Sequence, residues 1–151
     1  MRKNIFLILI IVTVGIIFLI WRLFFYIPPT SNFIDLKISN TTYKIELAET
    51  MAQKIKGLSG RESLCKKCGM LFVFELETEI PFWMKDTLIP IDMIWIDRNG
   101  KVVDIQTALE TNSEKLYRNK TPAIYVLELN ANDSQKLGLK TGDIIQLPNT
   151  L

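Results

Sequence analysis

The chain has 151 residues, enough for one domain and a terminal segment, with 18 basic and 16 acidic residues. It contains no histidine, which excludes Ser-His and Cys-His catalytic machinery. Beyond residue 32 the basic and acidic residues nearly balance and form no basic cluster, so nucleic acid is not an expected partner. No cofactor is expected, because the glycines are scattered rather than gathered in a phosphate-binding loop.

An apolar run without a charged residue, residues 5–21, lies near the N-terminus. As a helix it would be about 26 Å long, close to the thickness of a bilayer core. Arg2 and Lys3 precede the run and favour a cytoplasmic N-terminus with an extracytoplasmic C-terminal domain. We therefore predict a single-pass anchor in the lipid bilayer of the cell membrane over residues 1–27. A cleaved signal peptide is the alternative, but the small residues that cleavage requires are missing.

A short linker over residues 28–32 precedes the predicted globular domain, residues 33–151. The domain begins with apolar and polar residues in alternation, which predict a hairpin of two strands over residues 33–38 and 43–47. A threonine then stands where it can cap a short helix over residues 51–56, and a glycine follows the helix.

The central part of the sequence predicts four strands, over residues 69–75, 80–85, 91–97 and 101–107. Asn99-Gly100 separates the last two strands, and this dipeptide is typical of a type I′ hairpin turn. In the strand over residues 91–97, acidic, apolar and aromatic side chains alternate between the two faces. Both faces of that strand are therefore expected to be largely buried.

The C-terminal part begins with a polar segment over residues 107–121, expected to be mainly loop with some helix. A strand over residues 123–129, a short helix over 132–137 and a final strand over 144–147 follow. Many short strands with only brief helices predict a β-rich α+β domain. We expect a curled antiparallel or mixed sheet, or a small open barrel.

Two carboxylates occupy strand positions whose neighbours on the same face are apolar. Asp92 shares its face with Ile94, and Glu128 shares its face with Val126. A buried carboxylate is costly unless it is paired or hydrogen-bonded, so each predicts a partner. Arg61 is the candidate, because its planar guanidinium binds a carboxylate at two points. These three residues predict either structural ion pairs or the polar support of a pocket.

The turn after the strand over residues 80–85 is the candidate binding surface. Trp83 is expected to be partly exposed because the residues on either side of it point to the core. Together with Lys85, Asp86 and Thr87, it would form a rim suited to a sugar ring or a peptide. The alternative is that Trp83 covers the edge of the sheet and Asp86 caps its own turn.

Cys65 and Cys68 are the two cysteines of the chain. Outside the cytoplasm they are expected to form a disulfide that closes a small loop. A redox centre, free thiols and a metal shared with another chain remain alternatives, because the lysines between the cysteines would lower a thiol pKa. Two thiolates without histidine fall short of a zinc site within one chain, so no metal site is predicted.

An ordered series of motifs runs along the chain and resembles the domain of unknown function 192 family. The motifs are Gly57-Leu58 followed by Arg61, Gly69 to Phe74, Phe82 to Thr87, Pro90-Ile91-Asp92, Tyr125 to Leu129 and Gly142-Asp143. The resemblance covers residues 45–147 and implies a small exported or membrane-anchored prokaryotic domain of the β-rich α+β kind. It carries over no activity and no catalytic residue. The family pattern has Asn at Asp86, and many members lack the cysteine pair.

Three hypotheses for the function follow from these residues. The first is a membrane-anchored extracytoplasmic domain that binds an envelope saccharide or peptide at Trp83 and its turn. The second is a hydrolase that uses Asp92 and Glu128, or Asp86, with or without a divalent cation. The third is an assembly factor that docks on another envelope protein through the surface around Trp83. The sequence alone does not assign an enzyme activity.

Overall fold

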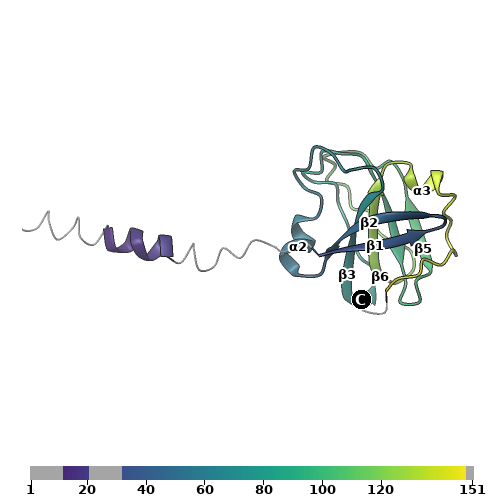
Figure 1. Cartoon of the computed structure of the whole chain (residues 1–151), viewed down its shortest axis with the longest axis horizontal. Helices are drawn as coiled ribbons and strands as arrows, with labels where there is room; N and C mark the ends of the chain where they lie inside the picture. The colour runs from purple at the N-terminus through teal and green to yellow at the C-terminus, as the bar shows by residue number, and fades with distance from the viewer. Residues whose placement is uncertain (1–11, 21–31, 149–151) are drawn as a thin grey trace, which may run out of the picture. The chain divides into compact units, whose positions relative to one another are not determined.

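The structure is a computed structural model that describes residues 12–20 and 32–148. Its contacts divide the chain into two units, residues 1–30 and residues 31–151. The second unit contains all six strands of the sheet and both hydrophobic cores (Figure 1). Because a domain with its own core folds independently, a fragment of residues 31–151 is expected to fold in isolation.

The N-terminal unit is helical over residues 12–20. Among the described residues, no helix combines the length and the apolar character needed to cross a membrane. Residues 5–11 and 21 of the predicted span, and most of the predicted linker, lie outside the described residues. The membrane anchor therefore stays a prediction.

A six-stranded mixed sheet forms the domain, in the order β1-β2-β3-β6-β4-β5. Strands β2 and β3 run parallel, and the other neighbours are antiparallel. The order ends at β1 and β5, so the sheet is not closed, and the predicted β-rich α+β class is confirmed. The elements are β1 (Phe33–Ile38), β2 (Thr41–Ala48), α2 (Met51–Lys56), β3 (Cys68–Thr78), β4 (Ile91–Ile96), β5 (Val102–Gln106), β6 (Ala123–Asn130) and α3 (Asp133–Lys136).

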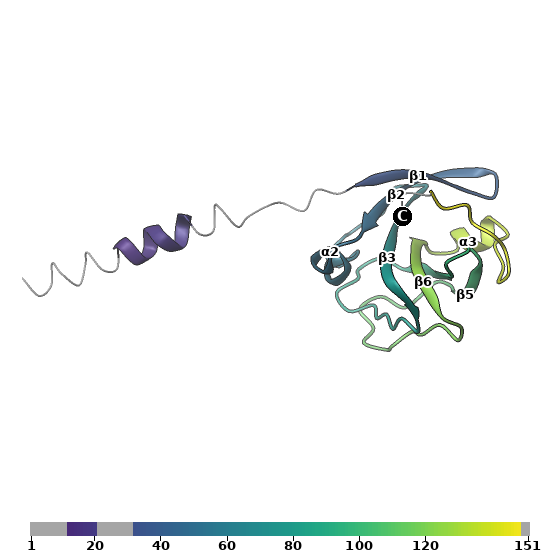
Figure 2. The same cartoon turned by 90° about the horizontal axis from the view of Figure 1, so that it is seen from below.

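Both faces of the sheet are buried, each against a different hydrophobic core. The β1–β2 hairpin lies across one side of the other strands, and it encloses the core that contains Ile94 and Ile96 (Figure 2). The opposite core contains Met93 and Trp95 and is covered by the loops that follow β3 and β5. The predicted alternation along β4 is therefore confirmed.

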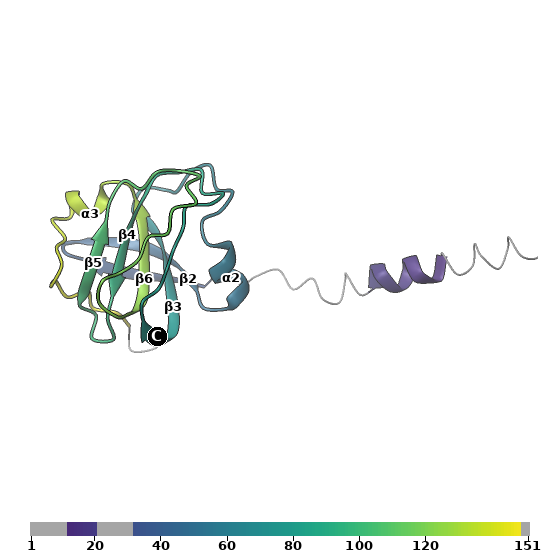
Figure 3. The ribbon, with the colours of Figure 1, turned by 180° about the vertical axis from the view of Figure 1, so that it is seen from behind.

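The two helices lie at opposite sides of the domain, α2 beside β2 and β3 and α3 beside β5 (Figure 3). The predicted cap of α2 is present: the Thr50 side chain accepts a hydrogen bond from the Gln53 amide, and the Gln53 side chain accepts one from the Thr50 amide. Gly57 ends the helix with a φ of 45°, in the left-handed region that favours glycine. The local sequence thus determines both ends of α2.

Two predicted strands are absent from the described sheet. Residues 80–85 are extended, but they form only an isolated bridge between Phe82 and Tyr117. Pro81 has no amide hydrogen to donate, which interrupts the ladder beside that bridge. Residues 144–147 likewise form a single bridge, between Ile144 and Lys101. Both predictions of a regular strand were therefore wrong.

The connection between β4 and β5 also differs from the predicted type I′ turn. That turn requires a positive φ at two successive residues, whereas Gly100 has a φ of 77° and Asn99 does not have a positive φ. The Asp97 side chain instead accepts hydrogen bonds from the amides of Asn99, at 2.8 Å, and Lys101, at 2.9 Å. The result is a three-residue loop in which the aspartate side chain supplies the acceptor.

Candidate functional site

A cleft of about 340 Å³ opens between the end of α2 and the extended segment that follows β3. Its size is within the range of small-molecule sites in proteins. The charged residues that line it are Lys54, Lys56 and Glu128, and Ser59 and Thr87 add hydroxyl groups. Its apolar wall is formed by Leu58, Phe72, Phe74, Ile80, Phe82 and Trp83.

An aromatic cluster makes one wall of the cleft rigid. The ring of Phe82 packs edge-on against Phe72, with the centroids 4.9 Å apart, and against Phe74, at 6.3 Å. Trp95 lies behind Phe82 at 6.5 Å, and its indole nitrogen donates a hydrogen bond to the Ile80 carbonyl over 3.2 Å. Edge-to-face aromatic pairs add stability beyond the area they bury, so this wall is largely formed before any ligand arrives.

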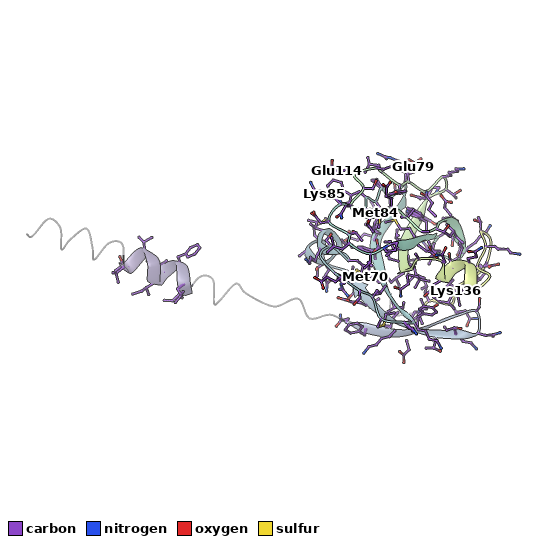
Figure 4. The ribbon with its side chains drawn as sticks, turned by 90° about the horizontal axis from the view of Figure 1, so that it is seen from above. Met70, Glu79, Met84, Lys85, Glu114 and Lys136 are labelled. Atoms are coloured by element: carbon purple, nitrogen blue, oxygen red, sulfur yellow. A yellow bond between two sulfur atoms is a disulfide. The ribbon has the colours of Figure 1, made fainter. Side chains whose placement is uncertain are left out.

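Trp83 lies at the mouth of the cleft with 52% of its surface exposed, as the alternation of residues 82–84 predicts. Its neighbour Met84 is fully buried. Lys85 turns away from the cleft: its ammonium lies 5.3 Å from the Trp83 ring centroid and 3.7 Å from a Glu114 carboxylate oxygen. Figure 4 shows Lys85 and Glu114 at the periphery, with Met84 farther inside. Trp83 is therefore a large apolar surface at an open mouth.

The turn at Asp86 fixes the position of this tryptophan. The Thr87 amide donates to the Met84 carbonyl over 3.1 Å, and the Gly60 amide donates to the Asp86 carbonyl over 2.8 Å. Asp86 has a φ of 56°, a conformation that Asn and Asp tolerate better than most residues. Of the four predicted rim residues, Trp83 and Thr87 line the cleft, whereas Lys85 and Asp86 form the turn beside it.

Glu128 lies in the cleft on β6, and only 4% of its surface is exposed. Its neighbours across the sheet are Met70 on β3 and Met93 on β4. The Oε2 atom is buried and has no hydrogen-bond partner. Burial raises the pKa of Glu128 from 4.5 to about 8, although the positive charge of Arg61 acts in the opposite direction. At pH 7 Glu128 is therefore mainly a neutral carboxylic acid.

Arg61 pairs with a carboxylate other than the two predicted ones. Its guanidinium lies 2.6 Å from a carboxylate oxygen of Glu46 on β2. Glu46 and Glu128 lie in one row across the sheet, on either side of Met70. The prediction that Arg61 would form a direct ion pair with Asp92 or Glu128 was wrong, because Glu46 already occupies the guanidinium.

Asp92 is completely buried and is satisfied by hydrogen bonds instead of an arginine. One of its oxygens accepts from the amides of Ala108, at 2.8 Å, and Asn132, at 2.9 Å. The other accepts from the Ser134 amide, at 3.0 Å, and the Ser134 hydroxyl, at 2.6 Å. Asp92 therefore joins β4 to the start of α3 and to the loop after β5, which is a structural role.

The geometry does not bring Asp92 and Glu128 together as a catalytic pair. Met93 lies opposite Glu128 in the register of β4 and β6, so Asp92 projects from the other face of the sheet. Within residues 12–20 and 32–148, no group of three or more His, Cys, Asp or Glu residues is arranged to hold a metal ion. A hydrolase that depends on these two carboxylates acting on one substrate has no support in this arrangement.

Cys65 and Cys68 form a disulfide, with their Cα atoms 5.3 Å apart. The bridge closes a tight turn in which the Cys68 amide donates to the Cys65 carbonyl over 3.1 Å. Asn130, at the end of β6, donates its side-chain amide to the same carbonyl over 3.0 Å. The disulfide therefore fixes the chain at the point where β3 begins.

The sequence gave no signal for the part of α2 that contributes to the cleft. Lys54 and Lys56 lie on a helix whose existence was predicted, but nothing in their spacing placed them near Trp83 or Glu128. Glu46, the partner of Arg61, was expected on a polar face of β2. The packing of α2 against the sheet decides both contacts.

The fold and the cleft define a small β-rich α+β domain with one open mixed sheet and a largely apolar cleft beside a short helix. Its sequence places it in a family. The profile of DUF192, described as "Uncharacterized ACR", matches residues 34–147, and the chain belongs to this family. The resemblance predicted over residues 45–147 is thus confirmed, and it extends to β1.

Proteins similar to this chain come from archaea and bacteria. The UPF0127 protein TK1120 of Thermococcus kodakarensis is 32% identical over 106 residues, which cover 68% of this chain and 63% of that protein. A Sinorhizobium meliloti 1021 structure, described as a proposed transcription regulator, has a TM-score of 0.68 and 34% identity, covering 70% of this chain and 82% of its own. A Novosphingobium aromaticivorans protein of unknown function has a TM-score of 0.74 and 28% identity, covering 81% and 90%.

Proposed function

We propose that this domain binds a small ligand, an envelope saccharide or peptide, in the cleft between α2 and Trp83. The observation that carries the proposal is the cleft itself, an apolar space of about 340 Å³ with a half-exposed tryptophan at its mouth and an unpartnered carboxyl oxygen in its lining. Apolar walls with a few polar groups are typical of ligand sites.

Two features of the cleft favour a binding role over a purely structural one. Trp83 leaves half of its surface in water, although a tryptophan contributes most to stability when it is buried. The unpaired oxygen of Glu128 costs stability, because a buried polar group without a hydrogen bond has lost its water. A bound ligand would correct both, by covering Trp83 and by supplying a partner to Glu128.

We also propose that the domain is held at the outer side of the cell membrane by its N-terminal segment. The apolar run over residues 5–21 and the basic residues Arg2 and Lys3 support this location. The disulfide between Cys65 and Cys68 is also typical of proteins outside the cytoplasm. An extracytoplasmic location would give the cleft access to envelope saccharides and peptides.

Ligand binding is expected to change the fluorescence of Trp83 in a fragment of residues 31–151. That fragment contains one other tryptophan, Trp95, which is fully buried in the core and provides a constant background. Titration with a panel of envelope glycans and peptides should give a saturable spectral shift that is lost in Trp83→Ala. A ligand whose binding, followed by calorimetry, is equally tight to the variant would place the site elsewhere.

The location is expected to be visible in spheroplasts that express the full chain with a C-terminal epitope tag. The tagged protein should sediment with membranes, and external protease should remove the tag from intact spheroplasts. A cytoplasmic marker protein that stays intact in the same sample is the control. A tag that is cleaved only after lysis would overturn the extracytoplasmic location.

A further inference from the structure

The charges around the cleft are arranged unevenly. Lys54 and Lys56 line it from α2, and the ammonium of Lys54 lies 4.9 Å from the centroid of the Phe74 ring in the cleft wall. Among the described residues, no carboxylate lies within ion-pair distance of either lysine. The cleft therefore presents two uncompensated positive charges to an incoming ligand.

The acidic residue of the cleft does not neutralise these lysines. Glu128 is surrounded by Met70 and Met93 on the adjacent strands, and the nearby Arg61 is engaged with Glu46. Because burial raises the pKa of Glu128 to about 8, its carboxyl group keeps its proton at neutral pH. In that form it has a hydrogen to donate as well as an oxygen that accepts.

We infer that the ligand of this cleft is a hydrophobic organic carboxylate, whose apolar group packs on the aromatic wall and whose carboxylate accepts a hydrogen bond from Glu128. This inference rests on the proposed binding function and names its ligand class. Lys54 and Lys56 supply the opposite charge, and Phe82 and Trp83 supply the apolar surface. A hydrogen bond from a neutral acid to a carboxylate is charge-assisted, and so is stronger than one between neutral groups.

Two other ligand types fit the same cleft less well. A cationic ligand would be repelled by Lys54 and Lys56 and would have to ionise a buried acid. A neutral sugar needs many hydrogen bonds, whereas most of the cleft wall is apolar. The favoured chemistry has two natural sources, a free hydrophobic acid or the C-terminal carboxylate of a peptide that ends in an apolar residue.

The test uses the fragment of residues 31–151 and three probes of one shape, 3-phenylpropanoate, its amide and 3-phenylpropylamine. Calorimetry near pH 6.5 should show the acid binding about tenfold more tightly than the amide, with the amine weakest. N-acetyl-Ala-Phe with a free or an amidated C-terminus then separates the two sources. Tighter binding of the free-acid peptide than of phenylpropanoate assigns a peptide, and the reverse assigns a free acid.

The pH dependence identifies the group that binds the carboxylate. Affinity for phenylpropanoate should fall about tenfold between pH 7 and pH 9, as Glu128 with its pKa of about 8 loses its proton. Glu128→Gln keeps a donor and should bind with no such loss. The double variant K54A/K56A should weaken the acid several-fold and leave the amide unchanged. Lys85→Ala, which removes a lysine outside the cleft lining, is the matched control and should change neither.

Each contrary result has a distinct meaning. Equal or tighter binding of the amide or the amine would overturn the carboxylate class. A saturable Trp83 signal with a neutral glycan, but with none of the acids, would overturn it too while leaving the binding function in place. Failure of every probe, glycan and peptide to bind a folded fragment would overturn the binding function itself.

Discussion

Glu128→Gln is expected to stabilise the domain by roughly 4 kcal/mol at about pH 8 and to leave its stability unchanged at about pH 4. The cause is the burial of a carboxyl group whose pKa rises from 4.5 to about 8 on folding. Glutamine has the same shape and a neutral amide, so it carries no ionisation cost. Since whole domains are stable by only about 5 to 15 kcal/mol, this change would be large.

The sign follows from the protons bound by each state. Between about pH 4.5 and pH 8 the unfolded chain has lost the Glu128 proton while the folded domain still holds it. The folded state then binds more protons, so stability falls as the pH rises through this window. Below the window both states are protonated, and above it both are ionised, so the contribution of Glu128 is constant on either side.

Urea unfolding of the fragment of residues 31–151 at a series of pH values would measure this difference. The free energy of unfolding of Glu128→Gln minus that of the wild type should rise through the window and then level off. Glu79→Gln is the matched control because Glu79 is exposed, and it lies at the periphery in Figure 4. A wild-type domain whose stability runs parallel to that of Glu128→Gln at every pH would contradict the buried neutral acid.

Asp92→Ala is expected to destabilise the domain by roughly 3 to 5 kcal/mol, in the opposite direction to the change at Glu128. The carboxylate of Asp92 accepts four hydrogen bonds, from Ala108, Asn132 and both the amide and the hydroxyl of Ser134. Alanine leaves these donors without an acceptor, and some of them are too deeply buried to reach water. The start of α3 then loses its attachment to β4.

Urea unfolding near pH 7 measures the loss, and hydrogen exchange locates it. The amides of Asn132 and Ser134 should lose protection before the amides of the central strands do. Asp35→Ala replaces an exposed aspartate on β1 and should change the stability by less than about 0.5 kcal/mol. An Asp92→Ala domain within 1 kcal/mol of the wild type would show that the four hydrogen bonds contribute little.

These two carboxylates show how far the sequence alone reaches. The alternation of β4 and β6 was enough to predict that Asp92 and Glu128 would both be buried, because side chains on a strand alternate between its faces. It was not enough to predict their partners. Asp92 found backbone amides from segments far along the chain, and Glu128 found none for one of its oxygens.

The family, the β-rich class, the cap of α2 and the exposure of Trp83 followed from the sequence by itself, because each depends on nearby residues or on the period of a strand. The tertiary structure alone decided the cleft. It packed α2 beside the aromatic wall, gave Arg61 to Glu46, and turned Asp92 and Glu128 to opposite faces of the sheet. Contacts between segments far apart in the chain depend on how the sheet curls and which loops cover it, and no local pattern encodes that.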